Sequence, residues 1–346
     1  MPIASSTDYT AMLDQAARDR YALPAVNVTS SGTLNAVMQG FAEAGSDGIV
    51  QITTGAADFL SGAAVRDMAL GARALAEYAH VLAQRYPIYV ALHTDHALPD
   101  KFDAFVRPLI AESHARRARG EEPLFNSHMF DGSTLPLDEN LRRSAELLDE
   151  LGPLGVVLEL EVGVVGGEED GVAGPRANRN ELYTTTDDLL RVADVLGTGE
   201  RGRYLVAATF GNVHGVYAPG QVKLRPEILG AGQAALAARH PGARFEYVFH
   251  GSSGSSPDEL SAAIDSGVVK VNLDTDAQYA YTRAVADHLF TNYDGVLRVD
   301  GGVGRKSSFD PRSWGRKAEA ALAAQVAGAA ELFGSAGKSR VAAKAA

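Results

Sequence analysis

The chain of 346 residues contains no cysteine. This absence excludes a disulfide framework, a thiolate nucleophile and a sulfur-ligated metal, so any metal site must use histidine, aspartate or glutamate. The sequence also lacks an apolar run long enough to span a bilayer, and residues 1–24 contain no basic leader followed by an apolar core and a cleavage site. We therefore expect a soluble, cytoplasmic protein with no membrane partner.

Positive charge is in short supply as well, because the formal net charge is -11 at pH 7. This balance disfavours nucleic acid as a partner, but a small anionic metabolite responds to local charge and stays possible. There is no Pro/Ser-rich linker and no shift in composition along the chain. With 46% hydrophobic residues, residues 1–346 are expected to form a single domain with an ample core.

Eight strand-like segments alternate with segments of helical periodicity. The predicted strands are 21–28, 47–53, 87–94, 124–131, 155–162, 204–211, 245–251 and 267–274. The clearest predicted helices between them are 31–45, 101–118, 139–152 and 256–267. This order predicts an α/β fold, a (β/α)8 TIM barrel. A doubly wound sheet is the alternative, but no G-x-G-x-x-G motif follows the first strand.

Two helical additions flank the predicted barrel. An extra helix is expected near residues 7–19, and a helical extension covers 312–334. The tail from about residue 335 is expected to be disordered, as chain ends often are.

Polar residues gather where the predicted strands end, which is where barrel enzymes place their chemistry. His96, His214 and His250 are each the last polar residue of a different strand segment. A single histidine of this kind is more often a satisfied core residue or part of a polar turn, but three at equivalent strand ends can converge on one zinc ion and leave a fourth position open. His114 and His240 are expected at the surface, as is His288.

A Gly/Ser-rich turn, "HGSSGS", follows the seventh predicted strand. Backbone N–H groups in such a turn bind anions, and barrels commonly hold phosphate after strands seven and eight. Gly251, Ser253 and the "NLDTD" residues 272–276 are therefore candidates for a phosphate site. The alternative is a flexible turn in which Ser255 or Ser256 caps the next helix.

The loop after the fifth strand, residues 163–186, is long enough to be a lid. Its paired glycines precede Glu168 and Glu169, and a carboxylate on a closing lid can act as a base; the alternative is a solvated acidic loop. The fifth strand itself carries Glu159 and Glu161 on one face. Because a buried carboxylate needs a partner, we expect Lys270 to pair with this face.

These residues sit in motifs that match a known family. "HTDH", "SHMFDGS", "LELEVGVVGGEEDGV", "ATFGNVHGVY", "VFHGSSGS" and "GVVKVNLDTD", in this order, closely resemble the class II, metal-dependent fructose-bisphosphate aldolases of the longer, class IIA subgroup. The resemblance covers nearly the whole chain from about Ile3. It implies a TIM-barrel lyase of glycolysis and gluconeogenesis that cleaves fructose 1,6-bisphosphate reversibly into dihydroxyacetone phosphate and glyceraldehyde 3-phosphate.

The resemblance implies cofactors and the residues that hold them. His96, His214 and His250 match the ligands of the catalytic Zn²⁺, while Asp131 and Glu161 match residues associated with a second, more mobile metal position. A monovalent cation, Na⁺ or K⁺, is implied at the carbonyl groups of Val213, Gly215 and Gly251.

Catalytic and substrate contacts follow from the same resemblance. Asp95 matches the proton donor and acceptor at the C4 oxygen, and Glu169 the base at dihydroxyacetone phosphate. The implied substrate-binding residues are Asn27, Thr53, Gly215, Gly251, Ser252, Ser253, Asn272, Leu273, Asp274, Thr275 and Arg312. Arg312 matches an arginine that reaches the second phosphate from a neighbouring subunit, so a homodimer or homotetramer is implied.

Three positions depart from the family pattern. Ser252 stands where glycine is usual, Thr53 where serine is usual, and Ala56 where glycine is usual. We expect activity to be retained, because backbone donors survive a Gly-to-Ser change at negative φ and threonine keeps a hydroxyl.

Three other functions compete with the fructose-bisphosphate aldolase. A tagatose-bisphosphate aldolase differs only in the configuration of its substrate at C4. A metallohydrolase commonly has H-x-H in its first strand, which is absent here because that strand ends in "PAVNV". A non-catalytic sugar-phosphate-binding barrel has no need of the proton-transfer groups Asp95 and Glu169.

Overall fold

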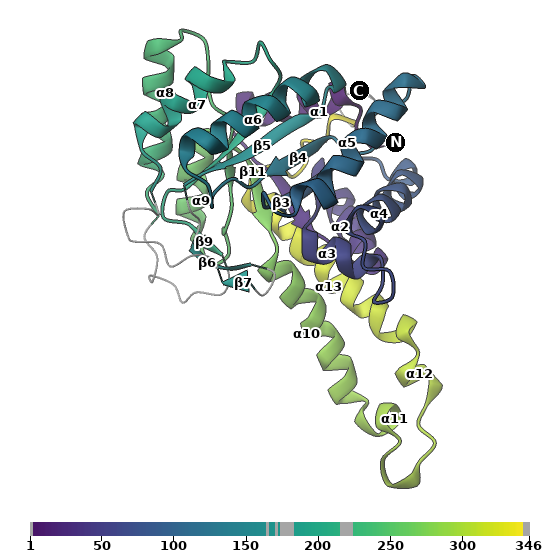
Figure 1. Ribbon diagram of the computed structural model, residues 1–346. Helices are drawn as coiled ribbons and strands as arrows, with labels where there is room; N and C mark the ends of the chain where they lie inside the picture. Colours follow the sequence, from purple (N-terminus) through teal and green to yellow (C-terminus); the bar gives the residue numbers. More distant parts are fainter. Residues whose placement is uncertain (1–2, 164–165, 170–171, 174–182, 215–223, 342–346) are drawn as a thin grey trace.

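The structure is a computed structural model that describes residues 3–163, 166–169, 172–173, 183–214 and 224–341 (Figure 1). For residues 166–169, 172–173 and 213–214 only the backbone is described.

Eight parallel strands close into a barrel, in the order β1-β11-β10-β8-β5-β4-β3-β2. All eight predicted strands are found, and the predicted (β/α)8 TIM barrel is confirmed. The strands are β1 (Leu23–Asn27), β2 (Gly48–Ile52), β3 (Val90–Ala97), β4 (Ser127–Phe130), β5 (Val157–Val162), β8 (Tyr204–Ala208), β10 (Tyr247–Phe249) and β11 (Val268–Leu273).

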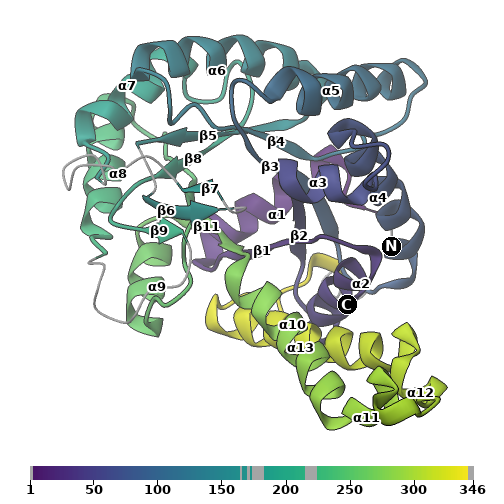
Figure 2. The same cartoon turned by 60° about the horizontal axis from the view of Figure 1, so that its bottom comes forward.

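Helices surround the barrel and connect its strands (Figure 2). They are α2 (Ser31–Ala44), α3 (Thr54–Leu60), α4 (Met68–Leu82), α5 (Phe102–Ala118), α6 (Leu137–Leu151), α7 (Thr186–Leu196), α8 (Glu227–Arg239) and α9 (Pro257–Asp265), with short 3-10 turns η1 (Ala83–Arg85) and η2 (Gly152–Leu154). Ser256 caps α9 by accepting from the Glu259 backbone N–H, so of the two serines predicted as possible caps, Ser255 and Ser256, it is the second that serves.

The predicted N-terminal helix is α1 (Ser6–Asp19), and it closes the bottom of the barrel. Tyr9, Met12 and Leu13 of α1 are fully buried and cluster with apolar side chains from the amino ends of the strands. Above this layer the barrel interior becomes polar. The bottom is therefore sealed by apolar packing, and the carboxyl ends of the strands are left for chemistry.

The segment predicted as a lid contains secondary structure that the sequence did not indicate. Strands β6 (Gly166–Glu169), β7 (Val172–Ala173) and β9 (Val213–His214) form a small separate sheet in the order β7-β6-β9. It lies on the mouth side of the barrel (Figures 1 and 2).

The C-terminal extension forms a helical arm that projects away from the barrel (Figures 1 and 2). It consists of α10 (Thr275–Thr291), α11 (Tyr293–Leu297), η3 (Val299–Gly301), α12 (Lys306–Phe309) and α13 (Pro311–Leu332). The expectation that His288 is a surface residue is wrong: its side chain is buried in the arm, with Nε2 2.8 Å from the Ser308 carbonyl oxygen. Of the other two histidines expected at the surface, His114 is exposed and His240 is partly buried.

The expected disorder from about residue 335 is wrong for residues 335–341, because this segment packs under the barrel. Ser339 Oγ donates to Asp47 Oδ1 at 2.6 Å and the Arg340 backbone N–H donates to Asp47 Oδ2 at 2.9 Å. Burial raises the pKa of Asp47 even though these hydrogen bonds oppose the shift. Residues 342–346 lie outside the described part of the chain.

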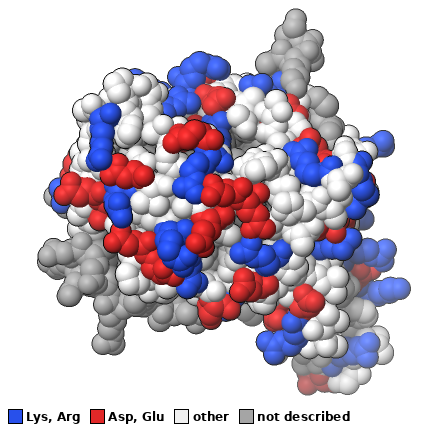
Figure 3. All heavy atoms as spheres, turned by 45° about the horizontal axis from the view of Figure 1, so that its top comes forward, with Lys and Arg blue, Asp and Glu red and all other residues white. Residues whose placement is uncertain are grey.

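On the face shown in Figure 3, acidic and basic side chains are interspersed. The described residues on this face therefore form no extended region of a single charge. No helix in the described ranges combines the length and apolar character that crossing a membrane requires.

Candidate active site at the barrel mouth

The end of β3 brings two neighbouring residues, Asp95 and His96, to the same site. Side chains alternate along a regular strand, so adjacent residues normally face opposite sides. Here the pairing with β4 shifts register between Thr94 and Ala97, and His96 has a left-handed φ of 43°. This bulge adds one residue to β3 and re-aims the chain, as bulges beside active sites commonly do. Asp95 and His96 can therefore both serve the barrel mouth.

His96 and His250 face each other across the barrel. His96 Nε2 lies 2.8 Å from His250 Nδ1. Behind them, His96 Nδ1 is 3.0 Å from Asp131 Oδ2, and His250 Nε2 is 2.8 Å from Glu159 Oε1. Because carboxylates accept hydrogen bonds, the tautomer that fits these contacts has the proton of each histidine on the outer nitrogen, and it directs the lone pairs of the two inner nitrogens at each other. That arrangement is repulsive unless a cation lies there, and a carboxylate behind each imidazole is typical of metal ligands.

Carboxylates surround the outer side of His96. Asp131 and Glu161 both approach His96 Nδ1, at 3.0 Å and 3.6 Å. Burial alone raises the pKa of Asp131, but the hydrogen bonds from His96 and Ser133 outweigh it and hold this pKa below its ordinary value. His96, Asp131 and Glu161 together offer ligand atoms within reach of one ion, as do Asp95, His96 and His250.

Asp95 is fully buried and held by amide side chains from several strands. Its Oδ2 accepts from Asn27 Nδ2 at 3.1 Å and from Gln51 Nε2 at 3.0 Å, and Asn272 Nδ2 lies 3.4 Å from Oδ1. Burial opposes the charged form, but His96, His93 and Lys270 together hold the pKa of Asp95 well below its usual range. The carboxylate is thus ionised and held in one orientation.

Glu159 occupies the centre of the polar interior. Lys270 Nζ donates to Glu159 Oε2 at 2.7 Å, and both side chains have zero exposure. The predicted pairing of Lys270 with this face of the fifth strand is confirmed. Although burial raises the pKa of Glu159, the charge of Lys270 and the two nearby histidines hold it below its ordinary value.

The Gly/Ser-rich turn after β10 lies beside the start of α10. Gly251 has a left-handed φ of 65°, whereas Ser252 does not, so serine is tolerated there. Ser252 Oγ donates to the Asn272 carbonyl at 2.8 Å. This bond ties the turn, including Ser253, to the segment of the remaining predicted contacts, Leu273, Asp274 and Thr275.

The predicted contacts on β1 and after β2 lie on the same side of the barrel. Asn27 ends β1, and Thr53 caps α3 by accepting from the Ala56 backbone N–H at 3.2 Å. Threonine thus retains a hydroxyl function at this position, and Ala56 is accommodated in the first turn of the helix.

Several predicted site residues lie outside what the structure describes. Gly215 is one of them, and the side chains of Glu169, Val213 and His214 are others. The backbone of β6 pairs with β9, with Gly167 opposite His214. Asn212 Nδ2 donates to the His250 carbonyl at 2.8 Å, which holds the start of this segment beside β10.

Arg312 is not brought to the mouth of its own barrel. It lies in the first turn of α13 in the arm, its side chain is 78% exposed, and its guanidinium pairs with Asp310 at 2.6 Å (Figure 1).

Comparisons with known proteins agree with this geometry. Residues 7–338 match the family model described as fructose-bisphosphate aldolase class-II. The chain belongs to the class II fructose-bisphosphate aldolase family. It is 55% identical to a fructose-bisphosphate aldolase of Mycobacterium leprae over 98% of this chain and 99% of that protein, and 56% identical to one of Streptomyces galbus over 97% and 99%. A crystal structure of a fructose-bisphosphate aldolase from Campylobacter jejuni superposes with a TM-score of 0.84 at 34% identity, covering 97% of both chains.

Members of this family are metal-dependent lyases that act on sugar phosphates, and the opposed histidines provide a fitting place for a metal. Sequence reasoning missed two residues that support this site. Gln51 donates to Asp95, and Asn212 donates to the His250 carbonyl. For Gln51 a signal was available, since it is a polar residue inside an apolar strand. His93, which the sequence places beside Asp95 and His96, is buried with Nε2 3.6 Å from Asp95 Oδ1.

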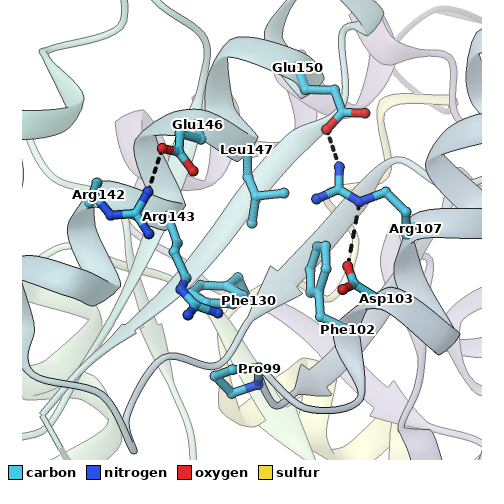
Figure 4. A pocket seen from close by; sticks show the side chains of 10 residues that line it. All are labelled: Pro99, Phe102, Asp103, Arg107, Phe130, Arg142, Arg143, Glu146, Leu147 and Glu150. Carbon is cyan, nitrogen blue, oxygen red and sulfur yellow. Dashed lines mark hydrogen bonds and ion pairs between the residues drawn. The ribbon is translucent and has the colours of Figure 1, made fainter.

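A cavity with a volume of about 250 Å³ lies outside the aldolase site, between α5 and α6 (Figure 4). Its arginines are already neutralised: Arg107 pairs with Glu150, Arg142 with Glu146 at 2.5 Å, and Arg143 with Glu139 at 2.7 Å. Because these charges are satisfied within the protein, the cavity does not resemble an anion site.

Proposed function

We propose that the chain catalyses the reversible, zinc-dependent aldol cleavage of fructose 1,6-bisphosphate to dihydroxyacetone phosphate and glyceraldehyde 3-phosphate. The observation that carries this proposal is the pair of inner nitrogens on His96 and His250, each with a carboxylate behind it. His214 would complete the zinc ligands, and Asp131 and Glu161 would form the second metal position. Imidazole is a preferred zinc ligand, and three protein ligands leave room for substrate.

Cleavage of a bond beta to a carbonyl requires stabilisation of the developing enediolate. When bound, zinc supplies this as a Lewis acid toward the ketose oxygens. Asp95 would remove the C4 hydroxyl proton during cleavage and return it during condensation. Its buried carboxylate suits that task, because three amide side chains fix its orientation. Glu169 would exchange the proton at C1 of dihydroxyacetone phosphate.

Two neighbouring segments near the mouth would anchor the phosphate of dihydroxyacetone phosphate. The segment at the start of α10 and the turn after β10 would hold dihydroxyacetone phosphate through Gly215, Gly251, Ser252, Ser253, Asn272, Leu273, Asp274 and Thr275. The carbonyl groups of Val213, Gly215 and Gly251 would bind Na⁺ or K⁺ beside it. Asn27 and Thr53 would face the substrate on the other side.

We propose that the enzyme is a homodimer or homotetramer in the cytoplasm. The arm exposes large apolar side chains, among them Phe290 at 78% and Val303 at 83%, together with Tyr293 and Leu297. Exposed apolar groups concentrated on one projection favour burial against another protein surface. The exposed Arg312 on the same arm would then reach the second phosphate in a neighbouring subunit's site.

An aldol-cleavage assay tests the proposal. EDTA treatment should abolish cleavage and added zinc should restore it, while borohydride in the presence of substrate should leave the enzyme active. A covalent adduct on Lys270 after borohydride treatment would instead show Schiff-base chemistry. Parallel assays with tagatose 1,6-bisphosphate distinguish the two sugar configurations.

A further inference from the structure

Lys270 is a fully buried cation at the centre of the barrel. Its side chain has zero exposure, and its amine donates to Glu159 at 2.7 Å. A bulge in β11 places Lys270 here. Tyr247 and Val248 of β10 pair with Val268 and Lys270, so Val269 is an extra residue in β11. Burying an ion pair costs desolvation energy and is seldom a gain in stability over apolar packing. A bulge that places such a pair beside a site points to a role in that site.

The second oxygen of Glu159 leads directly to a histidine of the site. Glu159 Oε1 accepts from His250 Nε2 at 2.8 Å, and the exposed fractions of the two side chains are 0% and 1%. Each Glu159 oxygen is therefore engaged, one by Lys270 and one by His250. With the carboxylate anchored at Oε2, its Oε1 has a set position, and His250 must keep its proton on Nε2 and its lone pair on Nδ1.

We propose that Lys270 is a positioning residue for the metal site, acting through Glu159 to orient His250 with Nδ1 toward the facing nitrogen of His96. The inference rests on the proposed metal-dependent function and extends it to an ion pair outside the proposed set of metal ligands and substrate contacts. The negative charge of Glu159 behind the imidazole also makes Nδ1 a better electron donor. Outer-shell groups of this kind commonly contribute 10- to 100-fold to metal affinity.

A purely structural ion pair would behave differently. If Lys270 and Glu159 only neutralise each other, replacing both with neutral side chains of similar size should leave zinc affinity unchanged. If they position His250, the neutral pair can fold while binding zinc more weakly.

The experiment compares the double variant Lys270→Met/Glu159→Gln with wild type. Zinc affinity of the metal-stripped protein is measured by competition with a chromophoric chelator, and thermal unfolding of the same metal-free protein reports folding. We expect zinc affinity about 10- to 100-fold below wild type, with a cooperative unfolding transition retained.

A matched control is the pair Arg203 and Glu246 at the bottom of the barrel. Arg203 Nε donates to Glu246 Oε2 at 2.8 Å, and the exposed fractions of the two side chains are 21% and 9%. The double variant Arg203→Met/Glu246→Gln also removes a largely buried ion pair, one that is remote from the mouth, and should keep wild-type zinc affinity.

Wild-type zinc affinity in Lys270→Met/Glu159→Gln would overturn the inference, as would an equal loss in the control pair. Failure of the wild-type protein to bind zinc would instead contradict the proposed function. If the double variant does not fold, Glu159→Asp decides, because it keeps the charge but withdraws the carboxylate from His250. It should weaken zinc binding, and unchanged affinity in Glu159→Asp would also overturn the inference.

Discussion

At the scale of single residues, Asp95 and Glu169 are assigned to different proton transfers. Asp95→Ala should reduce cleavage by roughly two to four orders of magnitude, the usual range for a lost general acid or base. Zinc should stay bound, because His96 and its contact with Asp131 are untouched. Glu169→Ala should instead slow exchange of the C1 proton of dihydroxyacetone phosphate with solvent, which needs no aldehyde.

Proton exchange followed by NMR, with bound zinc measured as the control, separates the two roles. If Glu169→Ala exchanges at the wild-type rate and Asp95→Ala does not, the two assignments are reversed.

Buried histidines should make the protein sensitive to acid. Burial lowers the pKa of His128 from 6.5 to about 3, and the hydrogen bond between its Nδ1 and Thr94 does not prevent this shift. Between these two pH values the unfolded chain binds a proton that the folded chain excludes, so the free energy of unfolding falls as pH decreases through 6.5. His128→Asn, which can keep the bond to Thr94, should reduce that slope by up to about 1.4 kcal/mol per pH unit.

Urea unfolding at several pH values from 7.5 down to 5 measures the slope. An unchanged slope in His128→Asn would mean that the histidine is already protonated in the folded protein.

At the scale of elements, the contact between α2 and α13 attaches the arm to the barrel. A Cβ atom on Gly40 would lie 2.6 Å from the Ala323 carbonyl oxygen and 2.7 Å from Val326 Cβ. Gly40→Ala should therefore lower the free energy of unfolding by about 1–3 kcal/mol, because overpacking outweighs the gain in helix propensity.

Gly328 of α13 is the control, since no atom lies within 4 Å of a Cβ built there. Gly328→Ala should raise the free energy of unfolding by up to about 1 kcal/mol. Denaturant unfolding of both variants checks the pair, and equal effects would show that helix propensity alone decides.

At the scale of the whole molecule, the proposed oligomer would share its active sites between subunits, because Arg312 lies on the arm and not at the mouth of its own barrel. Arg312→Ala and Asp95→Ala subunits are each expected to be poorly active alone. Mixed oligomers should regain part of the activity, because one site in each pair combines an intact Asp95 with an intact Arg312 from the neighbour. The measurement is the cleavage rate of verified mixed oligomers, and no recovery would place Arg312 in its own subunit's site.

Much of this fold and site followed from the sequence because the relevant signals are local. Strand-like apolar runs alternate with helical periodicity, so eight strands and a barrel were predictable. Strand-end polarity identified His96 and His250, and alternation along the fifth strand identified Glu159 with Lys270 as its partner. In contrast, the strands in the loop after β5 were missed because they are short, with four residues in β6 and two in β7. The order of residues 335–341 depends on hydrogen bonds to Asp47, which is distant in the sequence.

The sequence by itself determined which residues are available for chemistry, because the strand pattern and the absence of cysteine restrict metal ligands to histidine and carboxylate side chains at the strand ends. Only the tertiary structure decided how those residues are oriented. The left-handed backbone of His96 and the bulge in β11 redirect side chains away from regular alternation. The proton positions on His96 and His250 depend on carboxylates contributed by other strands, and closing the barrel is what brings these groups within hydrogen-bonding distance.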